Sequence, residues 1–412
     1  MTHVRLAAAF IFLGFVPGLA AQTATPETNG ADAPGALISI EFEERVSARS
    51  IGEQGVPLFE WFPAPTPRLA ADVYRVRFWS RDFDGTPAEV EATLFIPVTA
   101  LPLRAPVLAF GSGTTGLGDH CAPSLEQPEV RRWGYYRANM LAYASQGIIT
   151  IFPDYLGFND PDRPQRYFSK YAEGHLMLDS LRVARSVVAD PGRALRSRVL
   201  PSVHNVTAGY SQGGHAALAA ADLLESYAPE LTLSGAVGFG STNSVETLMR
   251  EAAYYSPEII YTYLQMYGEK RVKVEQLLQE RWIPTLEEDV MSMCVDEFQY
   301  YYPFDGEPLY TPEFHRALQA RRVHKEFPEF AAILDENESG LDGHGVPVLL
   351  VEGVQDIIVT PPAQREYADR LRASGSRVDL LELDGARHRH TRPAGFLPSV
   401  AFIRKVTAPG YG

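Results

Sequence analysis

A serine lies at the centre of residues 209–213, which read GYSQG. In the pattern Gly-x-Ser-x-Gly, the serine sits on a sharp turn between a strand and a helix, with its hydroxyl exposed. Glycines at the outer positions tolerate strained backbone angles and leave room for neighbouring backbone. A β-rich segment, residues 203–208, precedes the pattern, and an alanine-rich segment follows it. This context predicts that Ser211 is a nucleophile; the alternative is a glycine-rich turn that caps a helix.

A serine hydroxyl is a weak nucleophile at neutral pH, so it needs a histidine base and an acid that orients this base. Asp356 follows the apolar segment 346–351, in the loop at the end of a predicted strand. Catalytic groups lie at this end of the strands in open α/β sheets. We therefore predict Asp356 as the acid, against the alternative of an ordinary turn or cap residue. Asp384 is the second candidate, although its position close to the predicted base fits a turn better.

Two histidines, His388 and His390, lie in the loop after the last predicted strand. We favour His388 as the base because it follows the turn glycine Gly385 by three residues, and His390 is the alternative. The resulting chain order of Ser, Asp and His is that of the α/β-hydrolases. Three further histidines are expected to be structural, with a place in the site as the alternative: His120, His175 and His215.

Attack on a carbonyl creates an oxyanion, which requires backbone N–H donors that are already in place. The residue after the nucleophile, Gln212, supplies one donor in sites of this type. The glycine-rich loop after residues 106–110 is placed to supply the second, and we predict Thr114 as that donor. A phosphate-binding role for this loop is disfavoured, because it lacks both the Gly-Lys-Ser/Thr sequence and the dinucleotide-binding spacing.

The hydrophobic pattern predicts the elements that position these groups. Residues 73–79 and 89–96 alternate with period two, which indicates an antiparallel hairpin or meander around a turn at 82–86. Short apolar segments then alternate with amphipathic ones. This pattern predicts an α/β protein with a mostly parallel central sheet and helices on both faces. The apolar segments are residues 106–110, 147–152, 203–208, 233–238, 346–351 and 378–383.

The alternation stops between residues 240 and 345. This stretch has apolar and aromatic residues at helical spacing around 259–267 and a tyrosine-rich run at 299–304. We predict a helical cap inserted between two strands, which divides the core into residues 37–239 and 346–412. The aromatic side chains either pack the cap's own core or form a wall or lid over a substrate pocket.

The first residues resemble a targeting segment. Arg5 precedes an apolar run over residues 6–16, and small residues follow up to Ala21. This arrangement predicts a secretory signal peptide over residues 1–21, cleaved after Ala20 or Ala21. The alternative, a membrane anchor, needs about 20 apolar residues, and Pro-Gly interrupts this run. Residues 22–36 read as a flexible leader, so we expect a secreted or periplasmic protein.

The chain contains two cysteines, Cys121 and Cys294. In an oxidising compartment a disulfide between them is favoured, and two buried free thiols are the alternative. Cys121 follows Asp119 and His120, but a metal site there would need a second clustered ligand pair, so we predict none. A serine triad requires no organic cofactor, and we expect none.

Composition limits the classes of protein and partner. The 412 residues are 45% hydrophobic, which supplies a large core and argues against disorder. The 37 Lys and Arg residues against 51 Asp and Glu give a formal net charge of -14. Because no basic run is present, we expect no nucleic-acid partner.

The sequence resembles the secretory lipases, an α/β-hydrolase family of yeasts and bacteria. The resemblance extends from about residue 107 to the C-terminus, although the cap matches only in being helical. One departure is SGT at residues 112–114, where His-Gly-Thr is expected. The matching stretches are residues 113–116 (GTTG), 121–124 (CAPS), 153–157 (PDYLG), 178–185 (LDSLRVAR), 209–217 (GYSQGGHAA) and 227–231 (YAPEL).

The resemblance implies hydrolysis of carboxylic esters, with lipid-like acyl chains under the cap. It also implies the triad of Ser211, Asp356 and His388, and a disulfide from Cys121 into the cap, where Cys294 lies. We expect an exported lipase or esterase that takes small-molecule or lipid esters and contacts a lipid interface transiently. A peptidase or acyltransferase with the same triad, or a catalytically silent binding protein, is the alternative.

Overall fold

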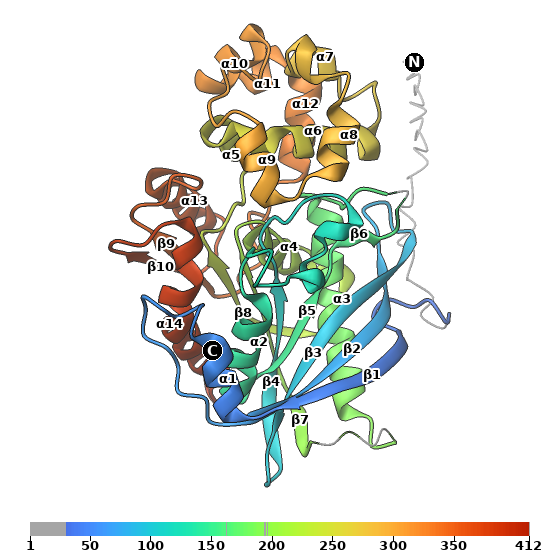
Figure 1. Ribbon diagram of the computed structural model, residues 1–412, viewed down its shortest axis with the longest axis vertical. Helices are drawn as coiled ribbons and strands as arrows, with labels where there is room; N and C mark the ends of the chain where they lie inside the picture. Colours follow the sequence, from blue (N-terminus) through green and yellow to red (C-terminus); the bar gives the residue numbers. More distant parts are fainter. Residues whose placement is uncertain (1–29, 162, 193–194, 196, 412) are drawn as a thin grey trace, which may run out of the picture.

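Apolar segments far apart in the sequence become neighbouring strands of one sheet. The computed structural model describes residues 30–161, 163–192, 195 and 197–411. Within these residues, nine strands are ordered β1-β2-β3-β5-β4-β7-β8-β9-β10 (Figure 1). The strands are β1 (Leu37–Val46), β2 (Ala70–Arg81), β3 (Pro87–Val98), β4 (Leu103–Gly111), β5 (Ile149–Pro153), β7 (Val199–Tyr210), β8 (Thr232–Phe239), β9 (Val348–Gly353) and β10 (Val378–Leu383), and the short β6 (Leu156–Asn159) stands apart from them.

The sheet has an antiparallel part and a parallel part. β1, β2, β3 and β5 pair antiparallel, and β2 and β3 form the hairpin that the alternation predicted. From β5 to β10 every neighbouring pair is parallel. The strands from β4 to β9 are buried over their carboxyl-terminal halves, because helices cover both faces. The predicted α/β-hydrolase architecture is confirmed.

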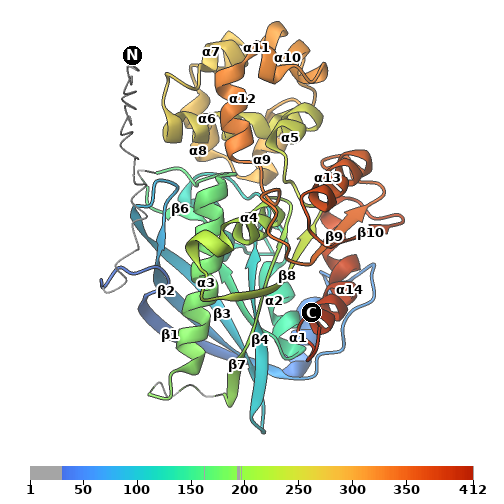
Figure 2. The ribbon, with the colours of Figure 1, turned by 180° about the vertical axis from the view of Figure 1, so that it is seen from behind.

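Two layers of helices cover the sheet. α3 and α4 pack on the face seen in Figure 2, and α1, α2 and α14 pack on the other. α13 lies beside β9 and β10. The helices are α1 (Ala48–Gly55), α2 (Tyr136–Ser145), α3 (Lys170–Ala189), α4 (Gln212–Tyr227), α13 (Pro361–Ala373) and α14 (Thr391–Val406).

Between β8 and β9 the chain forms helices only, and we call these the α5–α12 unit. It sits beyond the carboxyl ends of the parallel strands, at the top of Figure 1. Its side chains form a hydrophobic cluster of their own that includes Ile259, Ile260 and Tyr263. The helices are α5 (Val245–Glu251), α6 (Ser256–Tyr267), α7 (Val274–Leu277), α8 (Leu286–Ser292), α9 (Val295–Tyr301), α10 (Pro312–Gln319), α11 (Val323–Glu326) and α12 (Pro328–Glu336).

Local sequence explains where many of these helices begin. The side chains of Ser169, Ser244 and Thr311 accept a hydrogen bond from a backbone N–H in the first turn of α3, α5 and α10. Proline occupies one of the first two positions of α6, α10, α12 and α13, where its missing N–H costs nothing. The short helices of the α5–α12 unit therefore have defined starts.

The N-terminal segments predicted from the sequence fall largely outside the described residues. The signal peptide, residues 1–21, and residues 22–29 of the leader are among those outside. Residues 30–36, which we expected to be loose, form turns instead. Gly35 N–H donates to Trp79 O, and Trp79 N–H donates to Ala36 O, because this segment continues the pairing of β1 with β2.

No helix among the described residues is long and apolar enough to cross a membrane.

A disulfide joins the sheet domain to the α5–α12 unit. Cys121 and Cys294 are bonded, both are fully buried, and they are 173 residues apart in the sequence. Beside the bond, Val295 N–H donates to Thr115 O, and Gly116 pairs with Cys294. The expected pairing of the two cysteines is confirmed, and it ties the start of α9 to the loop that follows β4.

We expect that replacing both cysteines, Cys121→Ala with Cys294→Ala, lowers the free energy of unfolding by about 2–5 kcal/mol, because the unfolded chain gains the entropy of an open loop. Urea unfolding of the variant and of wild type measures the loss. Wild type treated with a reducing agent should show a similar loss. Equal stability of all three samples would contradict the prediction.

Candidate active site

Ser211 occupies a strained turn between β7 and α4. Its backbone angles are φ 52° and ψ -114°, a region that L-residues rarely adopt. The turn is held by Ser211 N–H, which donates to Phe239 O, and by Ser211 O, which accepts from Gly214 N–H. The surrounding structure therefore stabilises the strain and fixes the position of the hydroxyl.

Glycines around Ser211 allow three backbone segments to meet. A Cβ on Gly209 would lie 2.0 Å from Gly213 O, and a Cβ on Gly213 would lie 2.0 Å from Gly111 O. Both distances are far below van der Waals contact, so neither position accepts a side chain without movement of backbone. The outer glycines of the sequence pattern are thus required by the close approach of β7, α4 and the end of β4.

The structure brings the predicted nucleophile, base and acid into one chain of hydrogen bonds. Ser211 Oγ and His388 Nε2 are 3.0 Å apart, and His388 Nδ1 and Asp356 Oδ2 are 2.6 Å apart. Ser211 and Asp356 are buried, and His388 is the partly exposed member between them. This is the geometry in which a histidine can take a proton from a serine while a carboxylate holds its second nitrogen.

Loops at the carboxyl ends of strands position the base and the acid. Asp356 follows β9, and its Oδ1 accepts hydrogen bonds from the N–H groups of Ile358 and Val359 at 2.8 and 3.0 Å. His388 follows β10, and its ring packs on the Tyr210 ring with centroids 4.9 Å apart. Gly240 leaves space for the imidazole, since a Cβ there would lie 2.9 Å from His388 Nδ1.

The alternative candidates for base and acid lie elsewhere. His390 Nδ1 accepts a hydrogen bond from Arg387 N–H, and its ring packs against Phe62, so it faces away from Ser211. Burial and the two neighbouring arginines lower the pKa of His390 below its usual value. Asp384 is exposed in the turn after β10, at a position that suits the turn role considered for it.

A second carboxyl group lies beside Asp356 and was missed in the sequence. Glu352 is on β9, and its side chain is fully buried. Burial and the neighbouring Asp356 carboxylate raise the pKa of Glu352 to about 10. Glu352 is therefore protonated at neutral pH. One feature of the sequence could have pointed to Glu352. It is an acidic residue at the end of an apolar run, in a strand that is buried on both faces.

The two expected oxyanion donors both lie near Ser211. Gln212 is the first residue of α4, and Thr114 lines the same cavity as Ser211. Two buried tyrosines fix the loop that carries Thr114. Tyr136 OH accepts from Gly113 N–H at 2.7 Å, and Tyr167 OH forms a 2.7 Å hydrogen bond with Thr114 Oγ1.

A buried carboxylate holds the Gln212 side chain. Glu173 on α3 accepts hydrogen bonds from Gln212 Nε2 at 2.8 Å and from Phe168 N–H at 3.0 Å, and it pairs with His215 Nδ1 at 2.5 Å. The other ring nitrogen of His215 contacts Asn337 O, after α12, at 2.6 Å. This network ties α4 to α3 and to the α5–α12 unit, and the sequence analysis missed Glu173 because only the tertiary structure places it there.

The remaining histidines that we considered contact groups other than Ser211. His215 belongs to the network just described, and His175 stacks on Tyr227 with centroids 4.0 Å apart. Burial lowers the pKa of His175 to about 4, so this ring is neutral at physiological pH. His120 Nε2 bonds to Ser292 O. None of the three lines the cavity at Ser211.

A cavity of about 680 Å³ opens next to Ser211. Its volume falls in the range of small-molecule sites. The sheet domain contributes Ser211, Thr114 and His388, and the α5–α12 unit contributes aromatic residues such as Tyr254 and Phe304. Some aromatic residues of the unit thus line this cavity, and others pack the unit's own core. The lining is completed by Arg132, Trp133, Tyr210, Tyr255, Val295, Asp296, Gln299, Gln355, Ile357, Ile358, Arg387 and Arg389.

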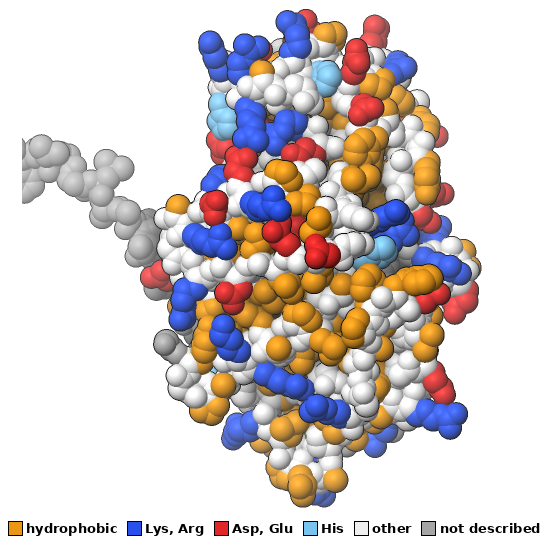
Figure 3. Space-filling model, turned by 90° about the vertical axis from the view of Figure 1, so that its left-hand side faces the viewer, with side chains coloured by type: hydrophobic (Ala, Val, Ile, Leu, Met, Phe, Trp, Pro, Cys, Tyr) orange, Lys and Arg blue, Asp and Glu red, His pale blue; other side chains and the backbone are white. Residues whose placement is uncertain are grey.

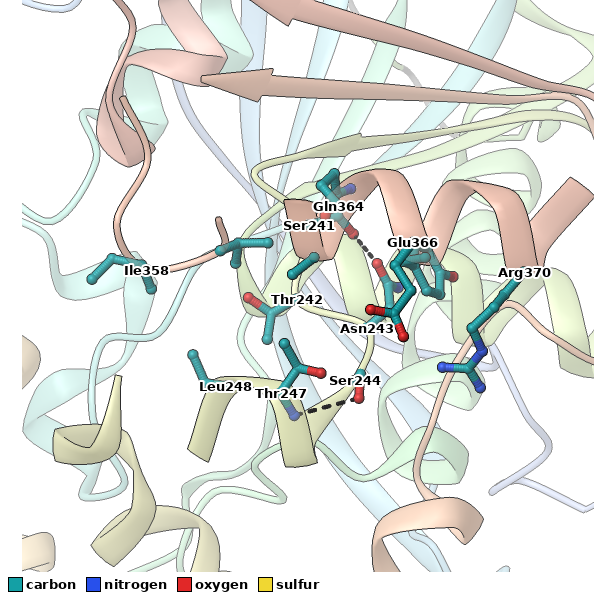
Figure 4. A pocket seen from close by; sticks show the side chains of 13 residues that line it. Ser241, Thr242, Asn243, Ser244, Thr247, Leu248, Ile358, Gln364, Glu366 and Arg370 are labelled. Atoms are coloured by element: carbon teal, nitrogen blue, oxygen red, sulfur yellow. Dashed lines mark hydrogen bonds between the residues drawn. The ribbon is translucent and has the colours of Figure 1, made fainter. Parts of the chain in front are cut away.

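A second cavity, of about 40 Å³, lies between α5, α13 and residues 241–244 (Figure 4). Ser241 Oγ donates to Asn243 Oδ1 at 2.5 Å, and Thr247 N–H donates to Ser244 Oγ, which fixes this segment. Thr242 also lines the small cavity, and its Oγ1 lies 3.5 Å from Ser211 Oγ. The space is too small for an ester substrate, so we assign it a packing role.

Possible metal ligands gather only around the disulfide in the part of the chain that the structure describes. One group is His120, Cys121 and Cys294, and the other is Cys294, Asp296 and Glu297. Both depend on sulfur atoms that are bonded to each other and so cannot act as thiolate ligands.

The model of the secretory lipase family matches residues 136–404, more than half of the chain. The chain therefore belongs to the secretory lipase family and is a carboxylic ester hydrolase. No curated protein sequence matches it.

Solved structures share its fold. The rice cell wall degrading esterase LipA from Xanthomonas oryzae is 20% identical, with a TM-score of 0.68 over 90% of this chain and 97% of its own. Candida antarctica lipase A in its closed state is 20% identical, with a TM-score of 0.65 over 92% of this chain and 84% of its own. At this level of identity the likeness shows the α/β-hydrolase fold.

We expect Gly213→Ala to lower the free energy of unfolding by about 3 kcal/mol or more, because the added Cβ collides with Gly111 O. Denaturant unfolding measures the loss. Gly52→Ala in α1 is the matched control, since the nearest atom to its Cβ is Pro67 Cγ at 3.6 Å. That change should be neutral or stabilise the helix by up to about 1 kcal/mol. An unchanged stability of Gly213→Ala would refute the steric argument.

We expect Glu352→Gln to gain stability relative to wild type as the pH rises from 5 to 9. Glu352 ionises in the unfolded chain near pH 4.3 but stays protonated in the fold until about pH 10. Folding of wild type therefore takes up a proton in this window, and its stability falls by up to about 1.4 kcal/mol per pH unit.

Urea unfolding of both proteins at several pH values measures this difference. The exposed residue Glu60 provides the control. Glu60→Gln should differ from wild type by an amount that does not change with pH. A constant difference between Glu352→Gln and wild type would show that Glu352 is ionised in the fold.

Proposed function

We propose that the protein is an exported serine hydrolase that cleaves carboxylic esters through an acyl-enzyme. Ser211 is the nucleophile, His388 the base and Asp356 the acid that orients it. The observation that carries this proposal is the chain of hydrogen bonds from Ser211 Oγ through His388 to Asp356 Oδ2, at 3.0 and 2.6 Å, beside a cavity of about 680 Å³.

In the first half of the reaction, His388 Nε2 accepts the proton of Ser211 Oγ while this oxygen attacks the ester carbonyl. Asp356 stabilises the imidazolium through His388 Nδ1–H. The protonated His388 then gives its proton to the departing alcohol oxygen, and the carbonyl re-forms as an acyl ester on Ser211. In the second half, water attacks this acyl group by the same steps and releases the carboxylic acid.

The negative charge on the carbonyl oxygen is stabilised by the backbone N–H groups of Gln212 and Thr114. Gln212 begins α4, so its N–H is one of the donors that a helix leaves free at its N-terminus. Thr114 is held by the hydrogen bond of its side chain to Tyr167 and by the neighbouring contact of Gly113 with Tyr136. These contacts keep the donor in place before the substrate arrives.

Residues 240–345 act as a cap in this proposal, between core segments 37–239 and 346–412. The cap contributes Tyr254, Tyr255 and Phe304 to the cavity, which gives the acyl or alcohol part of an ester an aromatic wall. Hydrophobic side chains gather in a band below the α5–α12 unit on the face seen in Figure 3. This band supports transient contact with a lipid interface.

Export through the signal peptide at residues 1–21 completes the proposal. It rests on the targeting pattern of these residues and on a buried disulfide, which is stable in an oxidising compartment. The family to which the chain belongs is named for secretion.

Initial rates on p-nitrophenyl esters from acetate to palmitate, together with a triglyceride emulsion, test the activity. We expect Ser211→Ala and His388→Ala to lower kcat roughly ten-thousandfold or more, because each removes a group that acts in the transition state. Rates that extend to long chains and the emulsion would define a lipase, and rates confined to short esters would define an esterase.

His390→Ala and Asp384→Asn are the matched controls, because each removes the same kind of side chain from the same loop. Both should keep kcat within a few-fold of wild type. Full activity of Ser211→Ala would overturn the nucleophile assignment. An inactive His390→Ala beside an active His388→Ala would move the base to His390.

A further inference from the structure

The cavity beside Ser211 carries a positive charge that the ester chemistry does not use. Arg132, Arg387 and Arg389 all line it, and they come from two loops far apart in the sequence. None of the three forms an ion pair with another residue that the structure describes. The protein as a whole has a formal net charge of -14, so this concentration of unpaired cations is opposite in sign to the rest of the molecule.

Acidic groups in the lining do not neutralise these arginines. Apart from the proposed triad, Asp296 is the one acidic residue of the lining, and it accepts the Trp133 Nε1–H hydrogen bond at 3.0 Å. The lining therefore has three positive side chains against this one negative side chain. Arg387 and Arg389 flank His388 in the sequence, and both line the same cavity as Ser211 and His388.

A fourth cation lies beneath the wall of the cavity. Arg392 is buried, and its guanidinium lies 4.7 Å from the ring centroids of both Tyr136 and Tyr210. Its Nη1 donates to Gly134 O at 2.7 Å, and no carboxylate among the described residues is within ion-pair distance of it. Tyr210 lines the cavity, so the charge of Arg392 adds to the positive potential there, while the Asp356 carboxylate, which also acts on Tyr210, opposes it.

We propose that this protein, acting through the proposed ester hydrolysis, prefers esters that carry a carboxylate or another anionic group, which Arg132, Arg387 and Arg389 bind at the cavity wall. An arginine guanidinium matches a carboxylate in shape and binds it through two N–H donors. At physiological salt, charges more than about 8 Å away are largely screened. The protein's distant negative charges therefore repel an anionic substrate only weakly, and the nearby arginines attract it.

Two matched pairs of soluble esters test the proposal without any lipid surface. On the acyl side, mono-4-nitrophenyl glutarate is compared with 4-nitrophenyl pentanoate, which has the same chain length without the charge. On the alcohol side, 3-(butanoyloxy)benzoate is compared with phenyl butanoate. The ratio of kcat/KM between the charged and the neutral ester cancels effects on the chemical step that both esters share.

We expect wild type to favour the charged ester in at least one pair. Arg387→Gln, Arg389→Gln and Arg132→Gln should each lower that ratio roughly three- to tenfold, mainly through KM, as expected for partly exposed charge pairs. Arg389→Lys should keep part of the preference because it retains the charge. The gap between wild type and variants should shrink when ionic strength rises from about 0.01 M to about 1 M, where screening extends to only about 3 Å.

Arg49→Gln is the control, because Arg49 lies on α1 outside the cavity and its loss removes the same formal charge. It should leave the ratio unchanged. A wild-type ratio of one or less in both pairs, or an equal loss in Arg49→Gln, would overturn the inference while leaving ester hydrolysis intact. Absence of Ser211-dependent hydrolysis of every ester would instead overturn the proposed function, and this inference with it.

Discussion

The arrangement around Ser211 depends on backbone segments that approach each other more closely than any side chain would allow. The end of β4, the end of β7 and the first turn of α4 meet at Gly111, Gly209 and Gly213. Because no Cβ separates them, the turn at Ser211 can adopt φ 52° and present its hydroxyl at the end of the sheet. Tight packing of helix α4 on the sheet and the strained backbone of Ser211 both follow from this close approach.

A parallel sheet then supplies the partners of that serine. Its strands point the same way, so the loops after β4, β7, β9 and β10 open at one edge, where Thr114, Ser211, Asp356 and His388 lie. Buried polar contacts fix these loops. Asp356 Oδ1, for example, accepts hydrogen bonds from two backbone N–H groups. Burial also gives the neighbouring Glu352 a raised pKa, which keeps a second negative charge away from Asp356.

The α5–α12 unit is bound to this edge by covalent and polar links. The disulfide connects Cys121, after the loop of Thr114, to Cys294 at the start of α9. Glu173 and His215 form a second link, from the start of α4 to Asn337. A substrate in the cavity would therefore touch two units whose spacing is restrained near Ser211. The arginine-rich lining arises where loops of both core segments converge, which is why its charge differs from that of the whole surface.

The sequence by itself determined the class of fold, the family and the residues expected at the site, since these follow from local patterns. Apolar runs of strand length, the GYSQG turn and the order Ser211, Asp356, His388 need no knowledge of distant contacts. β1 escaped notice because it is an edge strand whose exposed face carries charged residues. Only the tertiary structure shows that His388, and not His390, contacts Ser211, that Glu173 and Glu352 lie near the site, and that Arg132 lies with Arg387 and Arg389. These outcomes depend on which side of a loop or strand faces the cavity, and that is set by packing between segments far apart in the chain.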